Sequence, residues 1–211
     1  MEHGKNKQLH TQPILDVYLA KLPKDKPLIP LFPQERDDEV KNTKNETLQR
    51  EKYFAWKLLA YAVKNTFNKD LPPSLSKNEN GKWTAEEFTF SLSHSGGVVC
   101  VALSTAPVGV DVQKVALPKT KTTAFKIFSE EEKAEYAALP LDKQAEYFTR
   151  KWTERESVFK SLDLPAFFPA LPTLFKGKTV TKTILIGAKP YALSVSGAHL
   201  ETLRLYENCK L

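Results

Sequence analysis

The sequence of 211 residues has no long hydrophobic run and very little cysteine. Its longest purely apolar stretch, 98–103, is far too short to cross a bilayer, so no membrane-spanning helix is expected. The first ten residues carry no apolar stretch after their charges, so we expect no secretory signal. The two cysteines, Cys100 and Cys209, do not have the spacing of a metal site. The simplest interpretation is a cytoplasmic protein with reduced thiols.

Acidic residues are outnumbered by basic ones, and the formal net charge is +6. Such a surplus suits a nucleic acid, a phosphorylated small molecule or an acidic protein as partner. The sequence lacks an arginine-rich tract, zinc-finger spacing and an aromatic ribonucleoprotein motif, so a nucleic-acid partner is not expected. The hydrophobic content of 41% and the charged content of 27% are typical of a globular protein with a core of normal size.

Hydrophobic periodicity predicts helices and strands in both halves of the chain. Long helices are predicted at 46–67 and 142–163, and a shorter helix at 128–139 begins with a capping box of Ser129 and Glu132. Alternating apolar residues predict strands at 13–22, 88–92, 98–104 and 108–115, and three more at 179–187, 191–197 and 201–207, which we expect to form a meander. Proline- and turn-rich loops are predicted at 23–34, 68–83 and 164–172.

Each half therefore runs from a long helix through a loop to paired strands, and the halves join near residues 105–108. This order predicts an α+β (or α/β) fold in which antiparallel sheet packs on helices. We expect an N-terminal half at 1–106 and a C-terminal half at 107–211, with the active site in the cleft between them. No residue-level repeat links the halves, so the suggestion of internal duplication rests on topology alone.

Asp111 and Gln113 share one face of the strand predicted at 108–115. A carboxylate and an amide oxygen directed to one point are ligands suited to Mg2+, which commonly takes one or two carboxylates together with phosphate oxygens and waters. An isolated pair of this kind is more often a solvated strand face. Both interpretations stay open for this strand.

Trp152, Glu156 and Lys160 recur at fourfold spacing and therefore form one row on the second long helix. Glu156 and Lys160 are also the ordinary surface ion pair of a helix, which stabilises it by about 0.3–0.5 kcal/mol. Glu154 and Arg155 fall on other faces of the helix, where we expect them to be solvated.

The segment 91–97 places Ser93 and His94 at a strand end before two glycines, where hydroxyl, imidazole and flexible backbone can bind a phosphate. The alternative is a hairpin turn with a partly exposed histidine. No acid partner and no nucleophile elbow accompany the serine. Four lysines could also meet an anionic ligand, although a lone lysine is usually solvated: Lys41, Lys44, Lys57 and Lys82.

Four segments in order, "FTFSLSHSGG", "GVDVQ", "FSEEE" and "WTERESVFK", resemble the 4′-phosphopantetheinyl transferases of the larger, monomeric type that activates surfactin synthetase. The resemblance is dense over about a third of the chain, residues 88–160. It implies two similar halves related by a pseudo-twofold axis, with coenzyme A between them. It also implies Mg2+-dependent transfer of the phosphopantetheine arm to a serine of an acidic apo acyl or peptidyl carrier protein, with release of 3′,5′-ADP, by a cytoplasmic monomer. The carrier systems of fatty-acid, polyketide and nonribosomal-peptide synthesis all present such a serine.

The resemblance assigns roles to individual residues. Asp111 matches the first metal carboxylate, and Glu156 matches a helix carboxylate that is both a metal ligand and the base for the serine proton. Lys160 matches the lysine that contacts the pyrophosphate and could protonate the leaving group. Ser93 and His94 match the pair that meets the 3′-phosphate end of coenzyme A.

Further lysines resemble coenzyme A ligands of the family: Lys82 matches a turn lysine, and Lys41 and Lys44 match lysines before the first long helix. Three departures are visible in this sequence. Gln113 stands where the family has a glutamate, so it adds no charge to the metal site. Arg155 replaces a lysine and keeps its charge. Trp56 stands where the family commonly has an arginine for the 3′-phosphate, and Lys57 is the nearest substitute, although its helix direction differs by about 100°.

Two other functions remain compatible with these residues. The first is a non-catalytic module of the same fold that binds coenzyme A or an acidic protein. The second is a Mg2+-dependent phosphohydrolase that uses the same carboxylates on water.

Overall fold

A computed structural model describes residues 12–120, 122, 126–167 and 175–211. The first ten residues, on which the expectation of no secretory signal depends, lie outside this range, as does part of the loop predicted at 164–172. Within the described residues, no helix is sufficiently long and apolar to span a membrane. The thiols of Cys100 and Cys209 are both free.

The first half forms around one long helix, as its periodicity predicts. Asn45 caps this helix by accepting a hydrogen bond from the Leu48 amide, and the helix ends where Asn68 turns left-handed at a φ of 54°. The elements of this half are β1 (Leu15–Lys21), α1 (Gln34–Lys41), α2 (Glu46–Phe67), β2 (Ser76–Lys77), β3 (Trp83–Thr84), β4 (Thr89–Ser95) and β5 (Val98–Ser104). The loop predictions were wrong in two places, because Gln34 already begins α1 and because β2, inside 68–83, forms a short hairpin with β3, which begins at Trp83.

The second half has the predicted long helix and strands. Its elements are β6 (Val108–Lys114), α4 (Glu130–Ala138), α5 (Leu141–Leu162), β7 (Lys178–Ile186), β8 (Lys189–Gly197), the 3-10 helix η1 (Leu200–Thr202) and β9 (Leu203–Tyr206). The capping box at Ser129 and Glu132 is confirmed, since each residue's side chain bonds the other's backbone amide.

The strands form two main sheets, in the orders β4-β5-β1-β9 and β6-β8-β7. The expected meander of the last three strands is wrong, because β9 leaves β7 and β8 and pairs in parallel with β1 of the first sheet. A buried charge holds it there: Arg204 donates to both carboxylate oxygens of Asp16, at 2.6 and 2.8 Å. The second half thus supplies one strand to the sheet of the first.

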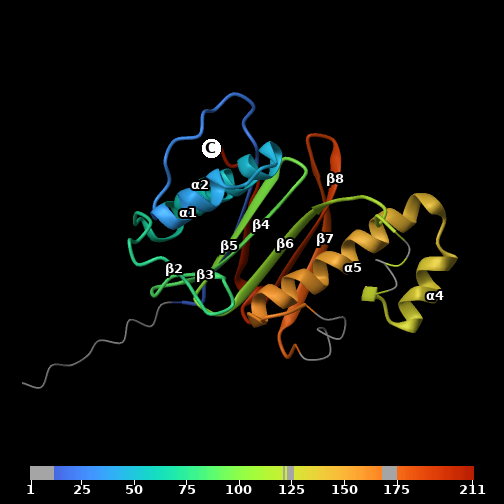
Figure 1. The fold of residues 1–211 in the computed structure, drawn as a ribbon. Helices are drawn as coiled ribbons and strands as arrows, with labels where there is room; N and C mark the ends of the chain where they lie inside the picture. The colour runs from blue at the N-terminus through green and yellow to red at the C-terminus, as the bar shows by residue number, and fades with distance from the viewer. Residues whose placement is uncertain (1–11, 121, 123–125, 168–174) are drawn as a thin grey trace, which may run out of the picture.

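The chain is a mixed α/β protein in which α2 packs on one sheet and α5 on the other (Figure 1). One apolar core lies between α2 and the first sheet, and a second joins the inner faces of the two sheets through residues such as Val17, Cys100 and Val110. The strands β4 and β6 bring the two halves together along their edges.

Serine side chains make the junction between β4 and β6. Alternate hydroxyls of β4 accept hydrogen bonds from alternate amides of β6: Ser91 from Val110 at 3.1 Å, Ser93 from Val112 at 3.0 Å and Ser95 from Lys114 at 3.2 Å. We call these three residues the serine row. They satisfy edge amides that would otherwise be buried without an acceptor. The sequence "SLSHS" therefore has a structural role that its spacing alone does not reveal.

Candidate functional site

Helix α5 lies almost in contact with the backbone of β6 because residue 109 has no side chain. A Cβ atom on Gly109 would lie 1.8 Å from the carbonyl oxygen of Ser157 and 2.6 Å from the amide nitrogen of Ser161. This close approach sets the helix on the face of β6 that carries Asp111. The last two turns of α5 therefore meet the first part of the strand, from Gly109 to Asp111.

Asp111 is the centre of the resulting cluster and is only 5% exposed. Its Oδ1 atom accepts hydrogen bonds from Ser93 Oγ and from Lys160 Nζ, each at 2.7 Å. Lys160 also donates to the Val110 carbonyl oxygen at 3.2 Å. The second oxygen, Oδ2, is buried and is among the few buried polar side-chain atoms of the described residues without a hydrogen-bond partner.

Glu156 shares the electrostatic environment of this cluster. Burial raises the pKa of its carboxyl above the ordinary value, the positive charge of Lys160 opposes this rise, and the negative charge of Asp111 adds to it. Among the ion pairs of the described residues, Lys160 is joined to Asp111 and not to Glu156. The interpretation of Glu156 and Lys160 as a simple surface ion pair is therefore wrong.

The neighbouring His94 is held by a residue that the sequence analysis missed. Glu51 of α2 is buried, and its carboxylate contacts His94 Nδ1 at 2.9 Å and accepts from the Gly97 amide at 2.8 Å. Burial alone would raise the pKa of Glu51, but the bonds from His94 and Gly97 lower it overall. An acidic residue on the apolar face of a predicted helix was the available signal, since Glu51 aligns with the buried Ala55 and Leu58.

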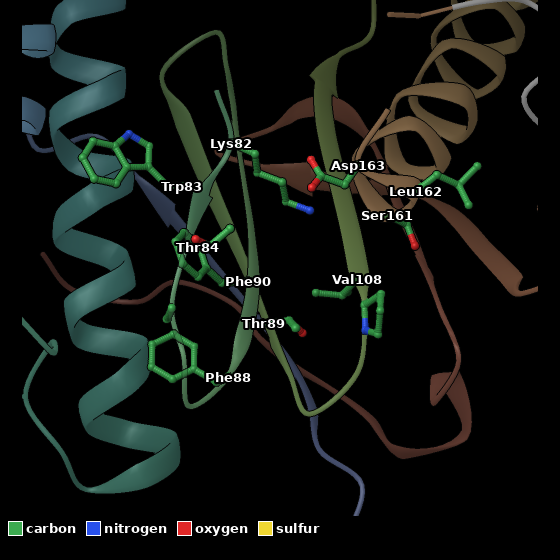
Figure 2. Close-up of a pocket in the computed structure, with 12 residues that line it drawn as sticks. Lys82, Trp83, Thr84, Phe88, Thr89, Phe90, Val108, Ser161, Leu162 and Asp163 are labelled. Atoms are coloured by element: carbon green, nitrogen blue, oxygen red, sulfur yellow. The ribbon is translucent and has the colours of Figure 1, made fainter. Parts of the chain in front are cut away.

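Lys82 lies at the same junction between the halves. It lines a hollow of about 290 Å³ together with Trp83, Val108 and Asp163, and Figure 2 shows its side chain extending toward β6 and the end of α5. Its Nζ donates to the carbonyl oxygen of Lys160 at 2.7 Å. Burial lowers the pKa of Lys82, the charge of Asp163 opposes this shift, and that of Lys160 adds to it.

A second hollow, of about 220 Å³, continues past Lys82 to Ser91 and Lys160. The turn before Lys82 is tied to the end of α5, because Asn80 donates a hydrogen bond to the Asp163 carbonyl oxygen at 2.6 Å. The structure thus brings Lys82, Lys160, Asp111 and the serine row to one junction.

The remaining predicted lysines lie elsewhere. Lys41 forms an ion pair with Asp37 at 2.5 Å, Lys44 is exposed, and Lys57 lines a separate hollow of about 440 Å³ with Tyr53. No contact recorded for the described residues joins these three lysines to Asp111, and their binding of coenzyme A stays a prediction.

Trp56 belongs to the core of the first half. Its indole nitrogen donates to the Phe32 carbonyl oxygen at 2.8 Å, and the guanidinium of Arg36 lies 5.1 Å from the ring centre. Arg155, which we expected to be solvated, is only 5% exposed and bonds Glu132 of α4 at 2.5 Å. That expectation was wrong, because α4 covers this face of α5.

Gln113 shares the face of Asp111 but lines another hollow, of about 450 Å³, together with Phe148 and Trp152. Its role as a metal ligand stays a prediction. In the described part of the chain, no three His, Cys, Asp or Glu side chains gather as a metal site. Mg2+ needs only one or two protein carboxylates when phosphates and waters complete its shell. The buried, unpartnered Oδ2 of Asp111 and the half-buried carboxylate of Glu156, which interacts with the charge of Asp111, fit such an ion.

Comparison with known proteins agrees with the motifs. Residues 107–191 match the model of the 4′-phosphopantetheinyl transferase superfamily, ACPS. The 4′-phosphopantetheinyl transferase psf-1 of Bacillus pumilus is 34% identical over 84 residues, which are 38% of this chain and 36% of that protein. For the transferase Sfp of Bacillus subtilis (strain 168), the identity is 35% over 71 residues, 34% of this chain and 31% of that protein.

The transferase AcpT of Salmonella typhi matches over a longer range, with 31% identity across 140 residues, 63% of this chain and 65% of that protein. The chain spans about a third of the length of the Bacillus relatives that it matches. The resemblance expected from the sequence is therefore confirmed: parts of this chain are similar to the 4′-phosphopantetheinyl transferases.

Proposed function

We propose that this protein transfers the phosphopantetheine arm of coenzyme A to a serine of an apo acyl or peptidyl carrier protein and releases 3′,5′-ADP. One observation carries this proposal: Lys160 of α5 bonds the buried Asp111 of β6 at the junction of the halves, and Glu156, one turn earlier on α5, interacts with the charges of both. The hollows beside Lys82 at the same junction give a ligand access to that cluster. We further propose that the halves are related by a pseudo-twofold axis, with coenzyme A between them.

Asp111 and Glu156 are the residues that would hold Mg2+, with Gln113 as a further candidate. When bound, the ion would neutralise charge on the pyrophosphate, which is the main requirement of phosphoryl transfer. Burial raises the pKa of Glu156, Lys160 opposes the rise, and the charge of Asp111 adds to it, so a cation between the two carboxylates would compensate charge that this place disfavours.

Glu156 is also suited to act as the general base. Burial raises the pKa of its carboxyl, which makes the carboxylate a stronger acceptor for the proton of the carrier serine. In the proposed step, the serine oxygen forms a bond to the β-phosphorus of coenzyme A, and the bond from that phosphorus to the bridging oxygen breaks. The serine proton goes to Glu156, and 3′,5′-ADP leaves with the bridging oxygen.

Lys160 is suited to stabilise that leaving group. Its ammonium is held between Asp111 Oδ1 and the Val110 carbonyl oxygen, so it is fixed in place before a ligand arrives. His94 and Lys82 are proposed to bind coenzyme A from the first half, as are Lys41, Lys44 and Lys57. The net charge of +6 favours an acidic carrier protein, because complementary charge speeds encounter. We propose a cytoplasmic monomer.

The direct test is mass spectrometry of an apo carrier protein incubated with this protein, coenzyme A and Mg2+. The proposal expects the carrier to gain one phosphopantetheine group, and EDTA to prevent the gain. Binding of coenzyme A with no gain across a panel of fatty-acid, polyketide and nonribosomal-peptide carriers would instead indicate a binding module. Loss of coenzyme A without carrier modification would indicate a phosphohydrolase.

A further inference from the structure

We propose that Ser93 is a positioning residue for Asp111, which it holds so that Oδ2 remains the oxygen available to a divalent cation. This inference rests on the proposed function, because it concerns the ion that Asp111 would bind there. It differs from the role that the family resemblance gives to Ser93, which is contact with the 3′-phosphate end of coenzyme A.

The hydrogen bonds of Ser93 leave it nothing to donate to a phosphate. Its hydroxyl is buried, with 4% of the residue exposed, and it accepts from the Val112 amide at 3.0 Å. Its single proton is donated to Asp111 Oδ1 at 2.7 Å. A phosphate group offers acceptors and therefore needs donors, and a serine hydroxyl has one donor. Ser93 has already used that donor on Asp111.

Both neighbours of the carboxylate act on the same oxygen. Ser93 and Lys160 each donate to Asp111 Oδ1, and they come from opposite sides of the junction, from β4 and from α5. Two donors on one oxygen fix the orientation of the carboxylate. The other oxygen is buried without a partner, an arrangement that costs free energy unless a cation or another donor completes it.

The serine row contains its own control. Ser95 is also buried, at 9% exposure, and accepts from the Lys114 amide just as Ser93 accepts from Val112. Within the described part of the chain, the Ser95 hydroxyl makes no hydrogen bond to a carboxylate. Replacing either serine by alanine removes an acceptor from an amide of β6, but only the change at Ser93 also releases Asp111. The difference between the two variants therefore measures the positioning effect.

The experiment measures Mn2+ binding, as a spectroscopic substitute for Mg2+, by electron paramagnetic resonance on the full chain with and without coenzyme A. Partners that orient metal ligands commonly change metal affinity 10- to 100-fold. We expect Ser93→Ala to weaken Mn2+ binding about tenfold and Ser95→Ala by no more than about twofold. Ser93→Cys keeps the shape but donates weakly, so it should weaken binding in the same direction if the alanine variant does not fold.

Equal Mn2+ affinity in Ser93→Ala and Ser95→Ala would overturn the inference, as would a wild-type protein that binds no Mn2+ with coenzyme A present. Loss of coenzyme A affinity in EDTA with unchanged Mn2+ affinity would also overturn it, and would make Ser93 a direct ligand. Carrier modification by the wild type is measured on the same preparations. Its absence would refute the proposed function, whereas its presence with unchanged Mn2+ affinity in Ser93→Ala would refute this inference alone.

Discussion

The contact of α5 with Gly109 makes a strong prediction about one methyl group. In Gly109→Ala, the new Cβ would lie 1.8 Å from the Ser157 carbonyl oxygen, whereas ordinary contacts begin at 3.4 Å. The obstructing atoms are backbone atoms, so they cannot rotate away as the end of a side chain can. The helix and the strand must separate by more than an ångström, and the separation falls on the turns that carry Glu156 and Lys160.

Two effects set the size of the change. Overpacking a core costs about 1–3 kcal/mol, and the backbone obstruction puts Gly109→Ala at the upper end. Replacing the glycine also stabilises the folded state by about 0.5–1 kcal/mol, because alanine loses less conformational entropy on folding. We expect the free energy of unfolding to fall by about 2 kcal/mol. A misplacement of about 1 Å can lower the rate of a positioned reaction about 100-fold. We therefore expect the transfer rate of the folded variant to fall about 100-fold as well.

The assay combines urea unfolding with the rate of carrier modification. The matched control is Gly197→Ala, another glycine in a strand, whose added Cβ would lie 3.3 Å from its nearest neighbour, the Pro107 carbonyl oxygen. We expect this control to stay within about 1 kcal/mol of the wild type. If Gly109→Ala matches the control in both stability and rate, α5 does not depend on the missing side chain, and the account of the site is wrong.

Glu156→Gln should abolish carrier modification, because the amide cannot accept the serine proton, while calorimetry should still detect coenzyme A binding; normal turnover would remove Glu156 from the mechanism. Glu51→Gln should change the proton on the His94 ring from Nδ1 to Nε2, because the new amide donates where the carboxylate accepted; unchanged ¹⁵N ring shifts would show that Glu51 does not set the tautomer. Glu132→Gln should cost about 3 kcal/mol in urea unfolding at neutral pH, because it leaves the buried Arg155 unpaired. Burial raises the pKa of Glu132, but hydrogen bonds and adjacent cations lower it below 4.5 overall. The stability that the Glu132 carboxylate contributes is therefore present above pH 4.5 and is lost as the pH falls through its folded-state pKa. A stability difference between wild type and Glu132→Gln that does not shrink on acidification would contradict this role of Glu132.

Local patterns predicted most of the secondary structure because the signals that start and stop these elements are local. Helix α2 has the predicted bounds, and the Ser129 capping box lies where its spacing indicates. Helix α1 was missed because it follows a proline-rich segment and has little amphipathic pattern. The pairing of β9 with β1 was missed because strand order depends on contacts between residues nearly 190 positions apart, such as Asp16 and Arg204.

The sequence predicted those site residues whose role follows from their own chemical type. It did not predict the residues whose role depends on tertiary contacts. Asp111 and Lys160 were named from motifs, and the structure brings them together. Glu51 was not named from the sequence, because a single acidic residue on a helix does not reveal that a histidine lies opposite. Arg155 was misjudged because its burial depends on α4, which packs against α5 through tertiary contacts.

The parallel pairing of β9 with β1 has a consequence for the order in which the protein is made. Strand β1 emerges from the ribosome nearly 190 residues before its outer neighbour β9. Until then, the fully buried Asp16 has no guanidinium to neutralise it. The sheet of the first half is therefore completed only after β9 has been synthesised, and neither half can reach its final structure as an independent fragment.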